Sequence, residues 1–173
     1  MTQVFGNKLA PVAAGYAELG LSVFPVQDGL ICVENPKDWK EQSSDDPGTV
    51  RDLFDLYPKA NGIALDCGKS GIVGIVLQEK EGVDIFDQAN ASHNIRTDTW
   101  SYRTSGGGLT LLYRADKENP IKTSLRHNIY TNIKGTGSYC LLPSSSEGEP
   151  WIKELDPKNT RLVPVDDSIK ALI

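Results

Sequence analysis

The sequence predicts a single α+β domain, in which a mixed sheet has flanking helices and later antiparallel hairpins. The chain has 173 residues, enough to bury one core, and is 39% hydrophobic and 24% charged, as is typical of a globular protein. Apolar residues recur at helical spacing in the first half, whereas short apolar runs separated by glycine turns follow later. We therefore expect one domain over residues 1–173.

The first elements are a helix and a short strand. Apolar side chains recur at helical spacing over residues 8–19, and Gly20 follows where a helix C-terminal glycine would lie. Residues 21–26 then resemble a short strand that Pro25 ends. The polar segment 27–44 has no regular pattern, so we expect a long loop there.

A second helix is expected to begin at Pro47, with Asp46 as its N-terminal cap. Its apolar face would consist of Val50, Leu53, Phe54 and Tyr57. The remaining expected elements are strands at residues 61–65, 72–77, 99–104, 109–113, 129–133 and 139–142, and helices at residues 82–93 and 165–173.

The charge of the chain is mildly negative overall but unevenly distributed. Net charge is −5, which argues against coating of nucleic acid by bulk charge. The segment from Glu34 to Asp87 contains twelve acidic and six basic residues, whereas the segment from Arg96 to Gly135 contains seven basic and three acidic residues. An anionic partner is therefore expected on the second half, although chance clustering on a solvated face explains the same pattern.

The cysteines and the hydropathy pattern indicate the cellular compartment of the protein. Cys32, Cys67 and Cys140 form no CxxC pair, which favours a reducing environment. The N-terminus has no signal-peptide pattern, and no apolar run is long enough for a membrane span. We expect a cytoplasmic protein without a membrane partner.

Two features point to phosphate chemistry. The segment SGIVGIVLQEK, residues 70–80, is typical of a buried strand running into a polar turn, where nucleotide-processing enzymes place acidic metal ligands. Glycine turns at residues 105–108 and 135–137 each lie close to a basic residue, Arg103 and Lys134. Such turns suit either a hairpin or close approach to a phosphate, and the first is not a Walker A loop because no Lys-Ser or Lys-Thr follows it.

Seven segments, in order, resemble the N-terminal domain of bifunctional DNA primase/polymerases, of the archaeo-eukaryotic primase superfamily. The resemblance covers nearly the whole chain and implies a primase–polymerase-like, RRM-like α+β fold. The segments are AAGYAELGLSVFPV (13–26), SSDDP (43–47, family A-T-T-D-P), NGIA (61–64, family N-I-G-I-A), RTSGGG (103–108, family R-T-x-S-G-G), KGTGSY (134–139, family R-G-D-G-G-Y), LPSS (142–145, family A-P-P-S) and VPV (163–165).

The resemblance also implies a metal-dependent site that this sequence lacks. The family uses two acids at a strand end, a histidine after the glycine turn and a third acid before the second turn. These roles fall at Val76, Gln78, Thr110 (or Leu109 in a tighter alignment) and Asn132. None of these residues supplies the carboxylates that Mg²⁺ or Mn²⁺ prefers, which indicates a degenerate active site with no metal or other cofactor.

Three functions remain open. The first is an inactive domain of a phage, plasmid or other replication system that binds DNA or a nucleotide. Its phosphate contacts would be Arg103, Ser105, Gly106, Gly107, Arg114, Lys122, Arg126 and Lys134. The second is a protein-interaction module for a replication or host protein, with residues 34–87 as its contact face. The third is an active enzyme in which Glu79 and Glu81 hold Mg²⁺ or Mn²⁺. We expect Trp100 and Trp151 to be packing residues.

Overall fold

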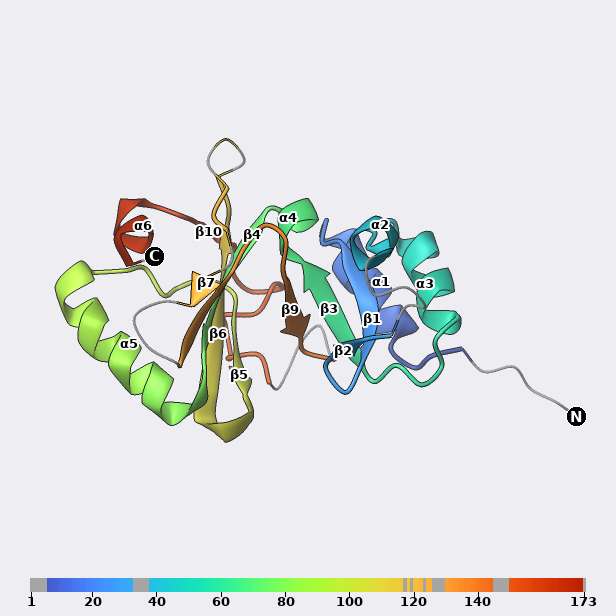
Figure 1. The fold of residues 1–173 in the computed structure, drawn as a ribbon, viewed down its shortest axis with the longest axis horizontal. Coiled ribbons are helices and arrows are strands. Elements are labelled where there is room, and N and C mark those ends of the chain that lie inside the picture. The colour runs from blue at the N-terminus through green and yellow to red at the C-terminus, as the bar shows by residue number, and fades with distance from the viewer. Residues whose placement is uncertain are drawn as a thin grey trace, which may run out of the picture. The chain divides into compact units, whose positions relative to one another are not determined.

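The computed structural model describes residues 6–32, 38–116, 118, 120–122, 124–125, 130–144 and 150–172. Its helices and sheets form an α+β fold, as the sequence predicts (Figure 1). The chain divides into two compact units: Met1–Ser70 with Tyr139–Ser146, and Gly71–Ser138 with Glu147–Ile173. Each unit has its own sheet, and the expectation of one domain over residues 1–173 stays a prediction.

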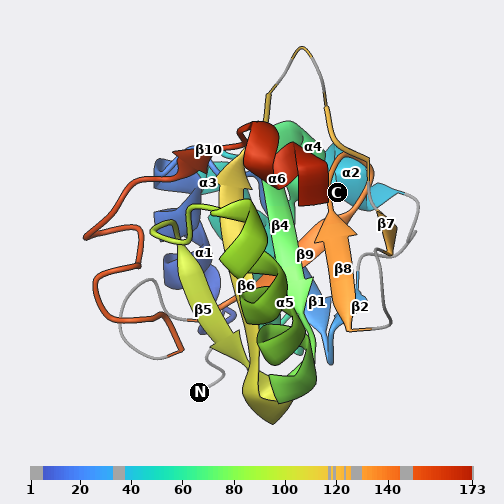
Figure 2. The same cartoon turned by 90° about the vertical axis from the view of Figure 1, so that its left-hand side faces the viewer.

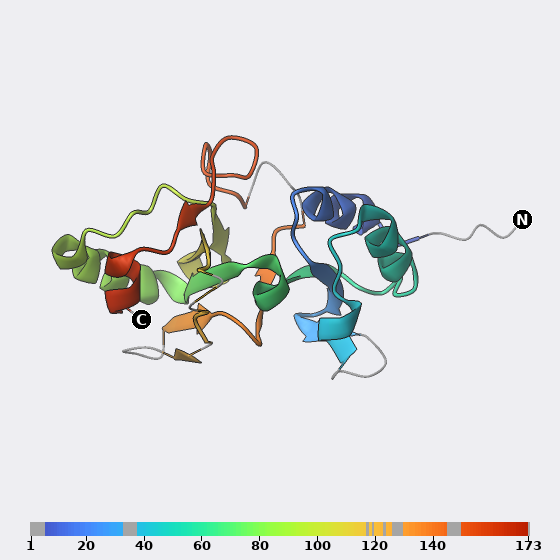
Figure 3. The same cartoon turned by 90° about the horizontal axis from the view of Figure 1, so that it is seen from above.

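The first unit contains a four-stranded antiparallel sheet in the order β2-β1-β3-β9. Its strands are β1 (Val23–Gln27), β2 (Leu30–Ile31), β3 (Gly62–Asp66) and β9 (Tyr139–Leu142), and its helices are α1 (Ala10–Glu18), α2 (Trp39–Gln42), α3 (Pro47–Asp55) and α4 (Cys67–Ser70). Figure 3 shows α1 and α3 side by side. A buried cluster around Phe24 and Trp39, whose ring centroids are 4.9 Å apart, forms part of the core.

The expectation that Pro25 ends the first strand is wrong. β1 continues to Gln27, and Pro25 lies opposite Ile63 within the sheet. The carbonyl of Pro25 accepts a hydrogen bond from the Cys32 thiol at 3.2 Å, so its backbone faces the side of β2. In β1, only Val26 and Gln27 pair with β2. The missing N–H of Pro25 therefore removes no hydrogen bond of this ladder.

The expected loop over residues 27–44 is also wrong in part. Asp28 and Gly29 have φ values of 52° and 77°, and they join β1 to β2 in a two-residue hairpin. Asp-Gly is a favoured pair for this turn, because both central residues need positive φ. The short helix α2 follows, and its Trp39 is buried.

Both predicted helix ends in this unit are confirmed. The Asp46 carboxylate accepts hydrogen bonds from the backbone N–H and the hydroxyl of Thr49, each at 2.8 Å. These bonds lower the pKa of the exposed Asp46 carboxyl. At the end of α1, Gly20 has a φ of 86° and its N–H donates to the Ala17 carbonyl at 2.9 Å.

The second unit contains a larger, mostly antiparallel sheet in the order β10-β6-β4-β8-β7, with β5 also paired to β6. Its strands are β4 (Ile72–Leu77), β5 (Ser101–Thr104), β6 (Gly108–Arg114), β7 (Ser124–Leu125), β8 (Thr131–Lys134) and β10 (Val163–Pro164). Its helices are α5 (Glu79–His93) and α6 (Asp167–Leu172), with a short 3-10 turn, η2, at Ser105–Gly107. The predicted strand 72–77 matches β4, whereas the helix predicted at 82–93 begins three residues earlier.

One face of this sheet is covered by α5 and α6, which lie in front of it in Figure 2. Odd-numbered residues of the central strands point to this face. They form a core with Phe86 of α5 and Ile169 of α6. The core residues of the sheet are Val73, Ile75, Leu77, Leu111, Tyr113 and Ile133.

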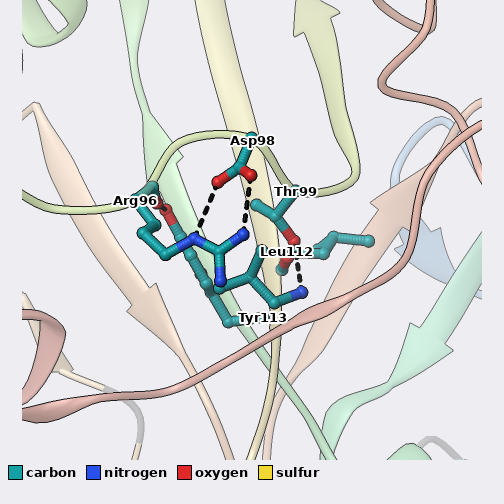
Figure 4. Close-up of polar contacts among 6 residues, drawn as sticks. Arg96, Asp98, Thr99, Leu112 and Tyr113 are labelled. Carbon is teal, nitrogen blue, oxygen red and sulfur yellow. Dashed lines mark hydrogen bonds and ion pairs between the residues drawn. The ribbon is translucent and has the colours of Figure 1, made fainter.

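In the second unit, a buried threonine makes hydrogen bonds to two other segments of the chain (Figure 4). The Thr99 hydroxyl donates to the Leu112 carbonyl at 2.5 Å and accepts from the Val163 backbone N–H at 3.0 Å. Nearby, the Tyr113 hydroxyl donates to the Arg96 carbonyl at 2.7 Å. Burial raises the pKa of Tyr113, so this phenol stays protonated as a donor.

Candidate functional site

Three of the positions at which catalytic residues are expected lie in one row across three adjacent strands. Val76 of β4 is the register partner of Thr110 on β6 and of Asn132 on β8. Directly paired residues of antiparallel strands point to the same face of a sheet. The structure therefore brings Val76, Thr110 and Asn132 together, and none of the three carries a charge.

This row lies on the face opposite the core beneath α5, because side chains alternate along each strand. Thr110 is 2% exposed, while Val76 and Asn132 are half-buried. Gln78 follows the end of β4 as the exposed residue that precedes α5. Leu109 packs against the opposite core, so Thr110, and not Leu109, shares the face of Val76.

Two cations lie on the same face as the row. Arg114 pairs with Ile72, and Lys134 pairs with Gly74, at even-numbered positions of their strands. Arg114 is exposed and Lys134 is half-buried. Within the described ranges, neither side chain makes an ion pair or a hydrogen bond. We call the face of Val76, Thr110, Asn132, Arg114 and Lys134 the central face.

Other residues expected to bind phosphate are placed differently. Arg103 pairs with Leu109, so strand alternation directs it away from the central face. Lys122 is exposed and forms a parallel bridge with Thr136. Arg126 lies outside the described residues. The structure thus brings two of the expected cations together and separates Arg103 from them.

The first glycine turn has a structural explanation within the chain itself. Gly106 and Gly107 have φ values of 74° and 81°, which disfavour any other residue. A Cβ on Gly106 would lie 3.4 Å from Glu79, and one on Gly107 would lie 3.4 Å from Lys80. The turn, which also includes Ser105, therefore packs closely against the start of α5.

The second glycine turn is similarly constrained. A Cβ on Gly135 would collide with the carbonyl of Ile121, and the Thr136 N–H donates to that carbonyl at 2.9 Å. At this turn too, the glycine allows close contact with another backbone segment of the same chain, here at Ile121. Neither turn therefore needs a bound phosphate to explain its glycines.

The geometry at Glu79 and Glu81 differs from the strand extension that a Glu-x-Glu metal pair would need. β4 ends at Leu77, and Glu79 has a left-handed φ of 57°. Both glutamates are exposed in the first turn of α5, so they do not continue the alternation of the strand. Among the residues that the structure describes, no group of three or more His, Cys, Asp or Glu side chains is arranged to hold a metal.

The comparison that decides the family is a match over most of the chain. The family model described as "Bifunctional DNA primase/polymerase, N-terminal" matches residues 13–163. The chain belongs to this family. No curated protein matches it. This Prim-Pol domain is thus primase/polymerase-like. In the parts of the chain that are described, no helix is long and apolar enough to cross a membrane.

A hollow of about 640 Å³ in the Prim-Pol domain was not foreseen from the sequence. It is lined by Arg103, Pro150, Trp151, Ile152 and Lys153. The expectation that Trp151 is a packing residue is confirmed, since it is 4% exposed. Lys153 belongs to none of the recognised motifs, so only the tertiary structure places it beside Arg103.

Proposed function

We propose that this Prim-Pol domain has lost catalysis and binds the phosphates of nucleic acid or a nucleotide through its central face. The observation that carries the proposal is the pairing of Val76 with both Thr110 and Asn132. The row joins positions that the family resemblance assigns to two acids and a histidine. At these positions the chain carries a methyl-bearing side chain, a buried hydroxyl and an amide instead.

Loss of catalysis follows from the ligand chemistry of divalent cations. Phosphoryl transfer by two metals requires hard oxygen ligands with negative charge. Val76 supplies no ligand atom, and Asn132 and Gln78 supply neutral carbonyl oxygens only. A metal held by such groups would be bound weakly, so template-directed synthesis is not supported.

Phosphate binding follows from the charges that remain. Arg114 and Lys134 give the central face two positive charges, and the row next to Lys134 on this face carries no carboxylate. The absence of acids from the row removes both the metal site and the repulsion that a phosphate would otherwise meet without metal. Binding is therefore expected to persist in EDTA.

Fluorescence anisotropy with labelled single-stranded, duplex and primer–template DNA tests the proposal. Wild type is expected to bind at low salt with and without EDTA, and Arg114→Gln with Lys134→Gln is expected to weaken binding roughly tenfold or more. Lys59→Gln with Arg161→Gln is the matched control, because it removes the same charge elsewhere. Absence of binding to every DNA and to a labelled nucleotide at low salt would contradict the proposal.

A second candidate function is protein interaction, favoured by a hollow of about 710 Å³ in the first unit. Its lining combines acidic side chains, Glu41 and Asp52, with apolar ones that include Leu56, which is 73% exposed. A replication or host protein with a basic and apolar segment would fit this lining. Capture of such a partner by wild type, but not by Leu56→Asp, would support this alternative over DNA binding.

A further inference from the structure

The hollow beside β5 in the second unit combines a backbone segment that is hydrogen-bonded to β5 with two cationic side chains. The backbone of residues 150–155 runs along β5 and is hydrogen-bonded to it. Arg103 N–H donates to the Pro150 carbonyl at 2.9 Å, and Ile152 N–H donates to the Ser101 carbonyl at 3.0 Å. These bonds fix the backbone positions from which the Arg103 and Lys153 side chains extend.

The aromatic part of this hollow is already occupied by internal packing. Trp151 is 4% exposed and Tyr102 is 3% exposed, and their rings meet edge to face with centroids 5.1 Å apart. A ring buried in this way leaves little face on which a nucleobase could stack. Recognition at this hollow must therefore depend on charge and not on base stacking.

Among the described residues that line the hollow, both charged side chains are positive. Arg103 and Lys153 are both exposed, and across the described ranges neither side chain has an ion-pair or hydrogen-bond partner. Glu154 is also exposed but does not line the hollow. Two cations on a fixed backbone match successive phosphates better than they match a single neutral ligand.

We propose that the Arg103–Lys153 hollow is a second phosphate-binding site, separate from the central face, which holds the sugar–phosphate backbone of a polynucleotide without reading its sequence. Strand alternation separates the two sites, because Arg103 pairs with Leu109 whereas Arg114 pairs with Ile72. A polynucleotide has phosphates for both sites at once. A free nucleotide has phosphates for only one.

The test compares an oligonucleotide with a free nucleotide across three charge-removing variants and one charge-keeping variant of the full chain. The ligands are a labelled 20-nucleotide single strand and a fluorescent ATP analogue, both in EDTA. The variants are Arg103→Gln with Lys153→Gln, the central-face pair Arg114→Gln with Lys134→Gln, and the control pair Lys59→Gln with Arg161→Gln. A charge-keeping pair, Arg103→Lys with Lys153→Arg, reports any loss due to misfolding.

The hollow variant is expected to weaken oligonucleotide binding roughly tenfold and to reduce the slope of log K against log salt by about 1.4, since each single-strand phosphate contact contributes about 0.7. Binding of the ATP analogue should be unchanged in this variant. Binding of an oligonucleotide of different sequence should weaken by the same factor as that of the first oligonucleotide. The charge-keeping pair should retain the wild-type slope.

Three outcomes would overturn the second site. Oligonucleotide binding that is unchanged in the hollow variant but lost in the central-face variant leaves the proposed function standing and removes this inference. Equal loss of the ATP analogue in the hollow variant assigns the hollow to free nucleotides instead. Absence of oligonucleotide binding by wild type removes this inference, and absence of ATP-analogue binding as well removes the proposed function.

Discussion

Val76 lies directly opposite Asn132 across the β4–β8 ladder, on the face of the sheet that α5 does not cover. Thr110 flanks Val76 on the other side. This arrangement is a row of neutral side chains at the place where the family resemblance expects metal ligands.

Restoring acids in the row should create a metal site. Val76→Asp with Gln78→Asp and Asn132→Asp places carboxylates on neighbouring positions, which repel one another without a cation. We expect a lower melting temperature than wild type in EDTA and recovery in Mn²⁺, with stabilisation of about 2.7 kcal/mol at a Mn²⁺ concentration 100 times Kd. Thermal melts with and without Mn²⁺ measure both effects.

The control for this variant is Val76→Asn with Gln78→Asn, which is polar but neutral. It should show no recovery in Mn²⁺. If the acidic variant melts at the same temperature in EDTA and in Mn²⁺, the side chains at positions 76 and 132 do not converge as the register indicates.

The glycine turn should be sensitive to a single methyl group. In Gly108→Ala the new Cβ would lie 2.6 Å from the Leu77 carbonyl oxygen and 3.1 Å from the Glu79 nitrogen, so backbone must shift. We expect a loss of about 1–3 kcal/mol in the free energy of unfolding. The matched change Gly15→Ala in α1 meets nothing within 4 Å and should gain about 0.5–1 kcal/mol. Urea unfolding measures both, and equal effects would contradict the close packing at Gly108.

Loss of the Thr99 hydroxyl should destabilise the second unit. Thr99→Val keeps the shape of the side chain but leaves the Leu112 carbonyl and the Val163 N–H without this partner (Figure 4). We expect a loss of about 2 kcal/mol in the free energy of unfolding. Thr99→Ser retains the hydroxyl and should lose less than Thr99→Val in the same denaturant series. The reverse order would show that the methyl group, not the hydroxyl, matters.

Acid should weaken the cap of α3. The pKa of Asp46 is lowered below its ordinary value of 3.8 in the folded chain, chiefly by the hydrogen bond from Thr49 N–H. A lowered pKa contributes stability that is present above the unfolded pKa and is lost as pH falls through the folded pKa. Asp46→Asn keeps a capping oxygen without titrating. The difference in melting temperature between wild type and this variant should therefore shrink on acidification from pH 7; a constant difference would contradict it.

The sequence predicts much of the local structure because the signals are local. The continuous apolar run of β4 and the Asp46 cap both depend on neighbours in the chain. The hairpin at Asp28 and Gly29 is equally local, and the Asp-Gly pair is its sequence signal. Periodicity alone does not detect this strand, since β2 has only two residues.

Features that depend on long-range packing were not predictable in the same way. Cys67 and Cys140 are 73 positions apart, yet their sulfur atoms lie 3.6 Å from each other. The glycines at Gly106 and Gly107 resembled a phosphate loop, but they lie against α5, which no local pattern indicates. Arg103 lies near the turn in the sequence but points away from Thr110, because strand parity and not proximity decides its face.

Template-directed nucleotide incorporation with Mn²⁺ at high protein concentration tests the central claim most directly. The account predicts no extension of a labelled primer, and none after Glu79→Ala with Glu81→Ala. Extension by wild type that this double substitution abolishes would contradict the claim, because it would show that the two glutamates hold the catalytic metal.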